Sequence, residues 1–172
     1  AIAAAAEQAP MTQGPATKGR VLGIDGDGLA YYCAGRDDTP SGQARRNVIE
    51  KVAAAQRAAG AEEVIILLTS PSSHKGFRYA VARAKPYQGK RSGGRRPKNW
   101  QYLRSLLEAG LPGVRTEITD NAEADDLFGK FSTALGHENF ALHTDDKDLR
   151  MVPGIHVDWH SMRITRVTPD TW

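Results

Sequence analysis

The stretch of sequence that decides the fold is a short aliphatic run closed by an acid and a glycine, Val21-Leu22-Gly23-Ile24-Asp25-Gly26. A brief apolar run bounded by Gly or polar residues is typical of a buried strand, and it predicts one over residues 20–24. Similar runs predict further strands over residues 63–68, 114–119 and 139–144. Helical patterns fill the intervals between the four strands. We therefore expect an α/β fold with a mostly parallel central sheet and right-handed crossovers.

The helical patterns have recognisable beginnings and ends. Residues 41–59 are alanine-rich, with apolar side chains at helical spacing and Gly60 as the stop signal. Pro97 is expected to open a second amphipathic helix, whose apolar stripe faces the core. The segment 120–123 resembles a capping box, which predicts a third helix through about residue 135.

The chain of 172 residues is long enough for one domain with a sizeable core. No apolar run approaches the roughly 18 residues that a spanning helix needs, so we expect no membrane protein. The single cysteine, Cys33, excludes an internal disulfide, favours a reducing cytoplasm and is expected to be buried. We divide the chain into a flexible leader over residues 1–19 and a core over residues 20–172, closed by a hairpin of residues 155–159 and 163–167.

Charge is distributed unevenly along the chain. Residues 75–104 contain ten Lys or Arg and no acid, whereas residues 117–148 contain nine acids against two lysines. Ordinary solvated surfaces mix the two signs. The basic part indicates a polyanionic partner, and the acids indicate cations that assist chemistry on it. Loop-forming residues within 70–97 predict that the basic part is an excursion from the sheet, with an unstructured surface loop as the alternative.

Acids follow three of the four predicted strands. They are Asp25 and Asp27 after the first, Glu123, Asp125 and Asp126 after the third, and Asp145, Asp146 and Asp148 after the fourth. The carboxyl ends of parallel strands lie at one edge, where sites form. Mg²⁺ or Mn²⁺ relieves the repulsion between close carboxylates, and a metal pair about 4 Å apart can act on a phosphodiester. Each group alone has a simpler explanation as a turn or a helix start. All three on one edge favour a metal site.

Three motifs resemble those of a known family. They are Asp25-Gly26 after a strand, then Glu123-Ala124-Asp125-Asp126-Leu127, then Thr144-Asp145-Asp146-Lys147-Asp148-Leu149. The same ordered acidic motifs occur in the flap endonuclease and 5'-3' exonuclease family, which has a PIN-like fold and includes phage exonucleases and the 5'-nuclease domain of bacterial DNA polymerase one. The resemblance covers about residues 20–172. It implies a nuclease of DNA replication and repair that hydrolyses DNA phosphodiester bonds with Mg²⁺ or Mn²⁺.

The resemblance also implies roles for single residues. The metal ligands would be Asp25, Glu123, Asp125, Asp126, Asp146 and Asp148, with Asp25, Asp126 and Asp148 as the firmest. Residues 85–91 are similar to the Tyr-Lys-x-Asn-Arg segment of the family's helical arch, an element through or under which single-stranded DNA passes. This implies single-stranded or flap DNA as the partner, with RNA as an alternative. Lys85 and Lys90 would assist catalysis. Nucleic-acid contacts would come from Arg78, Arg83, Lys85, Tyr87, Gln88, Lys90, Arg91, Arg95 and Arg96.

The sequence departs from the family pattern at three places. Thr69-Ser70 stands where the family often has an acid, and Gln88 stands where its catalytic lysine usually lies. The sequence as given ends at Trp172, before a further Gly-Asp-x-x-Asp motif, which supplies ligands for the second metal in the family, and before the family's duplex-DNA-binding element. Two alternatives therefore stay open. One is a nucleic-acid-binding module with weak or no turnover, and the other is a PIN-type ribonuclease.

Overall fold

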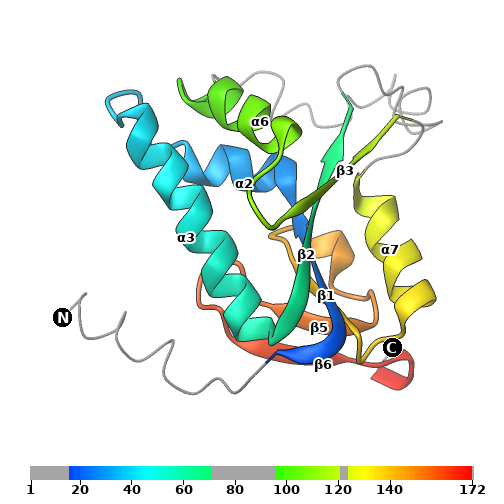
Figure 1. The fold of residues 1–172 in the computed structure, drawn as a ribbon. Helices are drawn as coiled ribbons and strands as arrows, with labels where there is room; N and C mark the ends of the chain where they lie inside the picture. The colour runs from blue at the N-terminus through cyan, green and yellow to red at the C-terminus, as the bar shows by residue number, and fades with distance from the viewer. Residues whose placement is uncertain (1–15, 71–95, 121–123, 172) are drawn as a thin grey trace.

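The computed structural model describes residues 16–70, 96–120 and 124–171, which form one sheet with helices on both faces (Figure 1). The strands are β1 (Thr17–Asp25), β2 (Ala61–Thr69), β3 (Arg115–Thr119), β4 (Phe140–His143), β5 (Gly154–Val157) and β6 (Ile164–Val167). The helices are α2 (Gly26–Cys33), α3 (Ser41–Ala59), α6 (Trp100–Ala109) and α7 (Ala124–Leu135), with short 3-10 helices η1 (Lys147–Leu149) and η2 (Pro169–Thr171).

The sheet has six strands in the order β3-β2-β1-β4-β5-β6. All neighbouring pairs are parallel except β5 and β6, which are antiparallel. The predicted mostly parallel α/β fold and the closing hairpin are thus confirmed. Because β1 pairs with both β2 and β4, Asp25 at its end lies close to the ends of those two strands. The carboxyl ends of five strands therefore meet at one edge of the sheet.

The sheet separates two apolar clusters. Successive side chains of a strand point to opposite faces. Leu22 and Ile24 accordingly join the cluster under α2, α3 and α6, whereas Val21 packs with Phe128 of α7 and with Phe140. Helices cover both faces, as Figure 1 shows, so β1 and β2 are buried on both sides. This explains why their sequences are continuous aliphatic runs and do not alternate with polar residues.

Most predicted boundaries hold within a few residues. Helix α3 has the predicted bounds, and Gly60 ends it with a φ of 61°, in the left-handed region that glycine adopts at low cost. Helix α6 begins at Trp100, three residues later than expected, and the Pro97 carbonyl accepts a hydrogen bond from the Trp100 amide. Strand β1 begins at Thr17, within the expected leader of residues 1–19.

Two smaller expectations can also be compared with the described residues. Cys33 is buried, as expected, with 2% of its surface exposed. Within the described part of the chain, no helix has both the length and the apolar character needed to cross a bilayer. The capping box expected at 120–123 falls largely on residues 121–123, which lie outside the described residues.

Candidate functional site

Asp25 ends β1 and caps the following helix. Its Oδ1 accepts a hydrogen bond of 3.1 Å from the Gly28 amide at the start of α2. Gly26 lies where α2 packs on β2, and a Cβ there would stand 2.5 Å from Leu68 Cδ2 and 2.9 Å from the Leu67 carbonyl oxygen. Only glycine fits so close to the neighbouring strand. The Asp-Gly pair thus places a carboxylate at the edge and lets the helix turn sharply away from it.

The acids after β4 are linked to Asp25 by a threonine. Thr144 Oγ1 donates to Asp25 Oδ2 over 3.4 Å and accepts from the Asp146 amide over 3.1 Å. Asp146 in turn caps η1, because its Oδ1 accepts from the Asp148 amide at 2.9 Å. Asp146 is half-buried and Asp148 is exposed. The first and the third acid group of the sequence therefore adjoin one another at the edge.

The second acid group lies in the first turn of α7. Asp125 and Asp126 are both half-buried, and the positive end of the helix dipole stabilises carboxylates at this place. The helix start is fixed by Thr69 at the end of β2, whose Oγ1 accepts from the Ala124 amide at 2.9 Å. Glu123 lies outside the described residues.

Asp27 has a different environment from the other acids. Its Oδ1 pairs with Arg104 Nη1, and its Oδ2 accepts from the Thr69 amide at 3.1 Å. Arg104 is only 5% exposed and also pairs with Glu108 over 2.9 Å. Both Asp27 oxygens thus accept from the protein, which ties the start of α2 to α6 and to the end of β2. Arg104, one of the ten cations of residues 75–104, is likewise part of the interior.

The edge fits a divalent cation in the chemistry of its donors. Carboxylate oxygens are the ligands that Mg²⁺ and Mn²⁺ prefer. Among the described residues, however, no three His, Cys, Asp or Glu side chains form a group able to hold a metal ion. The described carboxylates therefore supply suitable donors but do not form a complete site by themselves, and Glu123 is not among them.

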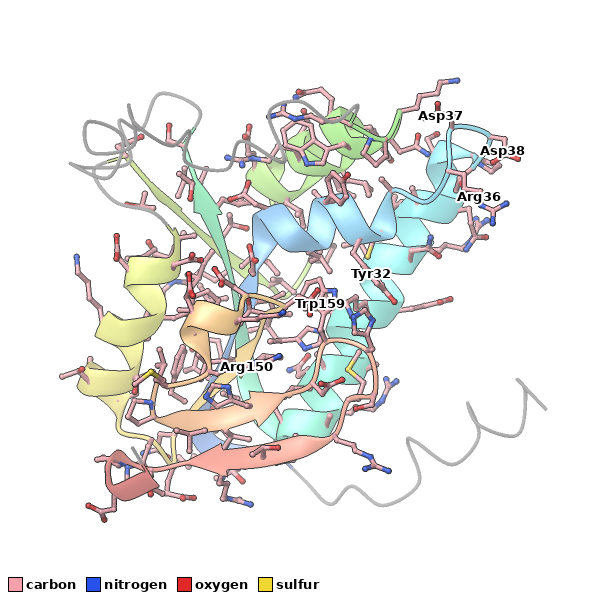
Figure 2. All side chains as sticks on the ribbon, turned by 180° about the vertical axis from the view of Figure 1, so that it is seen from behind. Tyr32, Arg36, Asp37, Asp38, Arg150 and Trp159 are labelled. Carbon is pink, nitrogen blue, oxygen red and sulfur yellow. The ribbon has the colours of Figure 1, made fainter. Side chains whose placement is uncertain are left out.

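Asp145 faces the loop between β5 and β6. It is 70% exposed, and its Oδ1 lies 3.9 Å from Nε2 of His160. Beside it, a buried lysine lies against two aromatic rings: Lys51 Nζ lies 4.5 Å from the centroid of Tyr32 and 4.2 Å from that of Trp159. Figure 2 shows Tyr32 and Trp159 next to one another. Lys51 also donates to the Trp159 carbonyl oxygen, and burial lowers the pKa of its ammonium group.

His143, the last residue of β4, is a core residue. Its Nδ1 donates to the Val157 carbonyl oxygen at 3.0 Å, and its ring centroid lies 4.7 Å from that of Trp159. Burial lowers the pKa of His143 to about 4. The imidazole is therefore neutral near pH 7, and its Nε2 has no hydrogen-bond partner among the described residues.

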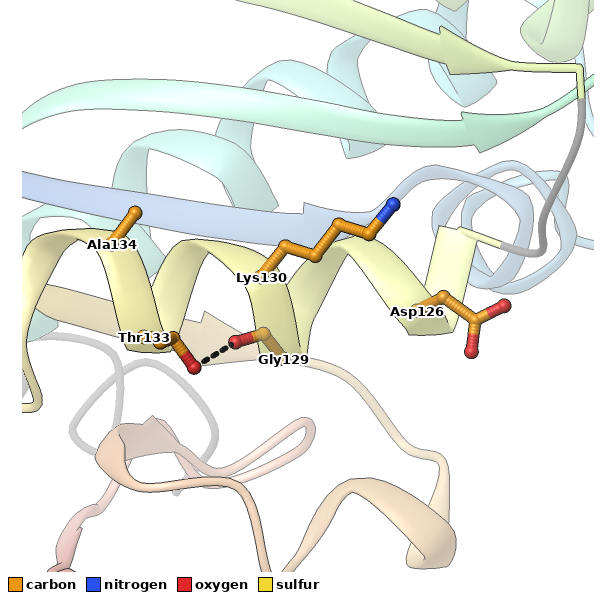
Figure 3. A pocket seen from close by; sticks show the side chains of 5 residues that line it. All are labelled: Asp126, Gly129, Lys130, Thr133 and Ala134. Atoms are coloured by element: carbon orange, nitrogen blue, oxygen red, sulfur yellow. Dashed lines mark hydrogen bonds between the residues drawn. The ribbon is translucent and has the colours of Figure 1, made fainter.

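A hollow runs along the outer face of α7 and reaches the acidic edge (Figure 3). It is lined by Asp126, Gly129, Lys130, Thr133 and Ala134. Asp126 lies at the first turn of the helix, so the hollow begins at the candidate ligands. Lys130 contributes a positively charged side chain to the hollow.

Most of the predicted basic contacts fall outside the described residues. This applies to Arg78, Arg83, Lys85, Tyr87, Gln88, Lys90, Arg91 and Arg95. Arg96 is described: its guanidinium stacks on the Trp100 ring at 4.0 Å from the centroid. Nearby, the buried Asn99 side chain donates to the carbonyl oxygens of Ala34 and Thr39. The beginning of α6, which follows the basic residues directly, is therefore fastened to the end of α2.

Comparison with known proteins finds similar structures but no similar sequence family. No family model matches the chain, and no curated protein matches it. Among solved structures, a bacteriophage T5 flap endonuclease complex with DNA and metal ions superposes with a TM-score of 0.63 and 15% identity, over 86% of this chain and 57% of that one. The T5 5'-exonuclease with bound zinc gives a TM-score of 0.60, also at 15% identity, over 86% and 58%. This chain thus spans little more than half of their length.

These likenesses identify the fold. The chain has the PIN-like fold of flap endonucleases and 5'-3' exonucleases, as the resemblance of its acidic motifs predicted. A further T5 structure crystallised with metal ions agrees, with a TM-score of 0.62 and 15% identity over 86% of this chain and 57% of that one.

Proposed function

We propose that the chain is a divalent-metal-dependent 5'-nuclease, of the 5'-3' exonuclease or flap endonuclease type, which hydrolyses phosphodiester bonds in DNA. The observation that carries this proposal is the hydroxyl of Thr144, which links Asp25 of β1 to Asp146 after β4 in a PIN-like fold. It brings together acids that are 121 positions apart in the numbering. Two fold neighbours support the proposal, because one holds DNA with metal ions and another holds zinc.

The proposed ligands are the acids of the edge without Asp27. They are Asp25, Glu123, Asp125, Asp126, Asp146 and Asp148. The ion is Mg²⁺ or Mn²⁺, because the donors are all carboxylates. When bound, such an ion would lower the pKa of a water molecule and neutralise charge on the phosphate. The protein holds the first turn of α7 and the end of β1 in place for it through Thr69 and Thr144.

The proposed substrate-binding part is the basic segment before α6. Lys and Arg neutralise phosphates, and Tyr87 offers a ring for an unpaired base. Single-stranded or flap DNA is the proposed partner, with Lys85 and Lys90 near the reacting phosphate. RNA is the alternative substrate, because cations and ring stacking do not distinguish the two sugars.

One observation favours a second candidate function. Thr69 stands where the resembling family often has an acid, and its side chain is used to cap α7. In addition, the described residues contain no group of three side chains able to hold a metal ion. The second candidate is therefore a nucleic-acid-binding module with little turnover. The two candidates share the binding of nucleic acid and differ in cleavage.

An end-labelled cleavage assay separates the candidates. Single-stranded, flap and duplex DNA, and the same strands as RNA, are incubated with the chain in Mn²⁺, in Mg²⁺ and in a chelator. The proposal expects metal-dependent cleavage of single-stranded or flap DNA. Binding without cleavage in either metal would establish the binding module, and cleavage confined to RNA would establish a ribonuclease. The variant Asp126→Asn, on the same substrates, guards against a contaminating nuclease.

A further inference from the structure

Thr69 uses all three of its polar groups to join two parts of the acidic edge. Its amide donates to Asp27 Oδ2 at 3.1 Å, its Oγ1 accepts from the Ala124 amide at 2.9 Å, and its carbonyl oxygen accepts from Arg104 Nη2. Asp27 belongs to the first turn of α2, and Ala124 is the first residue of α7. A single residue at the end of β2 thus holds the starts of two helices.

Arg104 reaches the same place from α6. Its guanidinium contacts Asp27 Oδ1 and the Thr69 carbonyl oxygen, and its Nε donates to Glu108 Oε1 at 2.9 Å. The arginine fork is planar and rigid, so two contacts at fixed angles define the positions of both partners. Because Arg104 is nearly buried, water cannot replace these contacts easily.

The network holds the chain within two residues of a candidate ligand on both sides. Asp25 is two residues before Asp27, and Asp126 is two residues after Ala124. A ligand set binds its ion well only when the supporting contacts hold it within about 0.5 Å of the required geometry. The separation between Asp25 and Asp126 therefore depends on Thr69 and Arg104, neither of which is itself a carboxylate donor.

We propose that Thr69 and Arg104 are positioning residues that raise the affinity of the acidic edge for a divalent cation without touching the ion. Arg104 and Asp27 form an ion pair, and both contact Thr69. The Thr69 hydroxyl in turn holds the first residue of α7. This inference rests on the proposed function, since it assumes that the acids hold a divalent ion. It assigns Asp27 to the support of the site and not to its ligands.

The first test replaces Thr69 with valine, which keeps the shape of the side chain and removes the acceptor for the Ala124 amide. Mn²⁺ affinity is measured by calorimetry, and stability by urea unfolding of the same samples. Loss of a supporting contact typically weakens metal binding about 10- to 100-fold, and this is the rise in Kd that we expect. Thr116→Val is the matched control, because Thr116 lies on the neighbouring strand β3 and its Oγ1 donates to the Leu107 carbonyl oxygen of α6 at 3.0 Å. Its Kd should equal that of the unchanged chain.

The second test compares Arg104→Gln with Glu108→Gln. The first removes the fork on Asp27 and Thr69, whereas the second removes only the charge of Glu108 and keeps an oxygen that can accept from Arg104 Nε. We expect weaker Mn²⁺ binding for Arg104→Gln alone. If Arg104→Gln does not fold, Thr69→Val decides the question.

The outcomes separate the inference from the function on which it rests. No Mn²⁺ binding by the unchanged chain would overturn the metal site, and the inference with it. Binding by the unchanged chain and equal binding by folded Thr69→Val would overturn the positioning role alone. A purely structural role would lower the urea midpoint and leave the Kd unaltered.

Discussion

Thr144 Oγ1 lies 3.4 Å from Asp25 Oδ2 and donates a hydrogen bond to it, although Asp25 ends β1 and Thr144 directly follows β4. The same oxygen accepts from the Asp146 amide at 3.1 Å. The hydroxyl therefore orients one carboxylate and fixes the backbone of the next. Parallel pairing of β1 with β4 makes this contact possible, because it brings Ile24 opposite His143, one residue before each partner.

Replacing Thr144 with valine tests this contact. The variant loses the donor to Asp25 and the acceptor for the Asp146 amide, so we expect Mn²⁺ to bind about 10-fold more weakly. Thr133→Val on α7 is the matched control, since Thr133 Oγ1 donates to the Gly129 carbonyl oxygen of its own helix. Equal Kd values for both variants would show that Thr144 does not support the ligands.

Nucleic-acid binding should depend steeply on salt because of the basic segment. Each phosphate contact contributes about 0.7 to the slope of log K against log salt on single strands. We expect a smaller slope when five cations of the segment become alanine, namely Lys85, Lys90, Arg91, Arg95 and Arg96. The slope is measured by fluorescence anisotropy with a labelled oligonucleotide. Arg45→Ala with Arg46→Ala, on α3, should keep the original slope; a slope unaltered in the five-residue variant would place binding on another face.

His143 should make the protein less stable in mild acid. Its pKa is about 4 in the folded chain and 6.5 for the free group, so the unfolded chain binds more protons between these values. The contribution of His143 to the free energy of unfolding is fully present above pH 6.5. It is lost as the pH drops to about 4, and the loss is about 3 kcal/mol. Urea unfolding of His143→Gln should lack this part of the pH dependence. His137→Gln keeps the buried imidazole of His143 and should keep the pH dependence of stability. Identical pH profiles for both variants would contradict the assignment of this dependence to His143.

Cys33 should be unreactive in the folded protein. Burial raises the pKa of its thiol from 9.0 to about 12, which leaves about 1000-fold less thiolate at pH 8. A chromogenic disulfide reagent should therefore react slowly in buffer and at once in concentrated urea. Rapid stoichiometric reaction in buffer would show that the α2 region opens readily.

The arrangement of the edge could be predicted because it depends on local patterns. The aliphatic runs before Asp25 and before His143 indicate buried parallel strands, and parallel strands end at a common edge. Gly60 and the alanine-rich residues before it were sufficient to give α3 its bounds. In each case a short stretch of sequence carries the whole signal.

The buried charges could not be predicted in this way. Arg104 lies in a run of positive charge, and nothing nearby in the sequence shows that Asp27, 77 positions earlier, is its partner. The one local sign was Glu108, four residues after Arg104 on the same helix. Lys51 similarly packs against Trp159, 108 positions away. Such contacts depend on how the helices lie on the sheet, which the periodicity of the sequence does not specify.

The central claim is that the acids of the edge bind a divalent cation, and a calorimetric Mn²⁺ titration tests it most directly. The account predicts that the unchanged chain binds Mn²⁺, whereas Asp125→Asn with Asp126→Asn folds and does not bind it. Without metal, that variant should stay folded, because the relief of repulsion between like charges offsets the lost interaction of the two carboxylates with the helix dipole. The acid pair Asp37 and Asp38, labelled in Figure 2 on the loop after α2, supplies the control, and its double Asn variant should bind as before. Equal titration curves for the unchanged chain and the Asp125 and Asp126 variant would contradict the account.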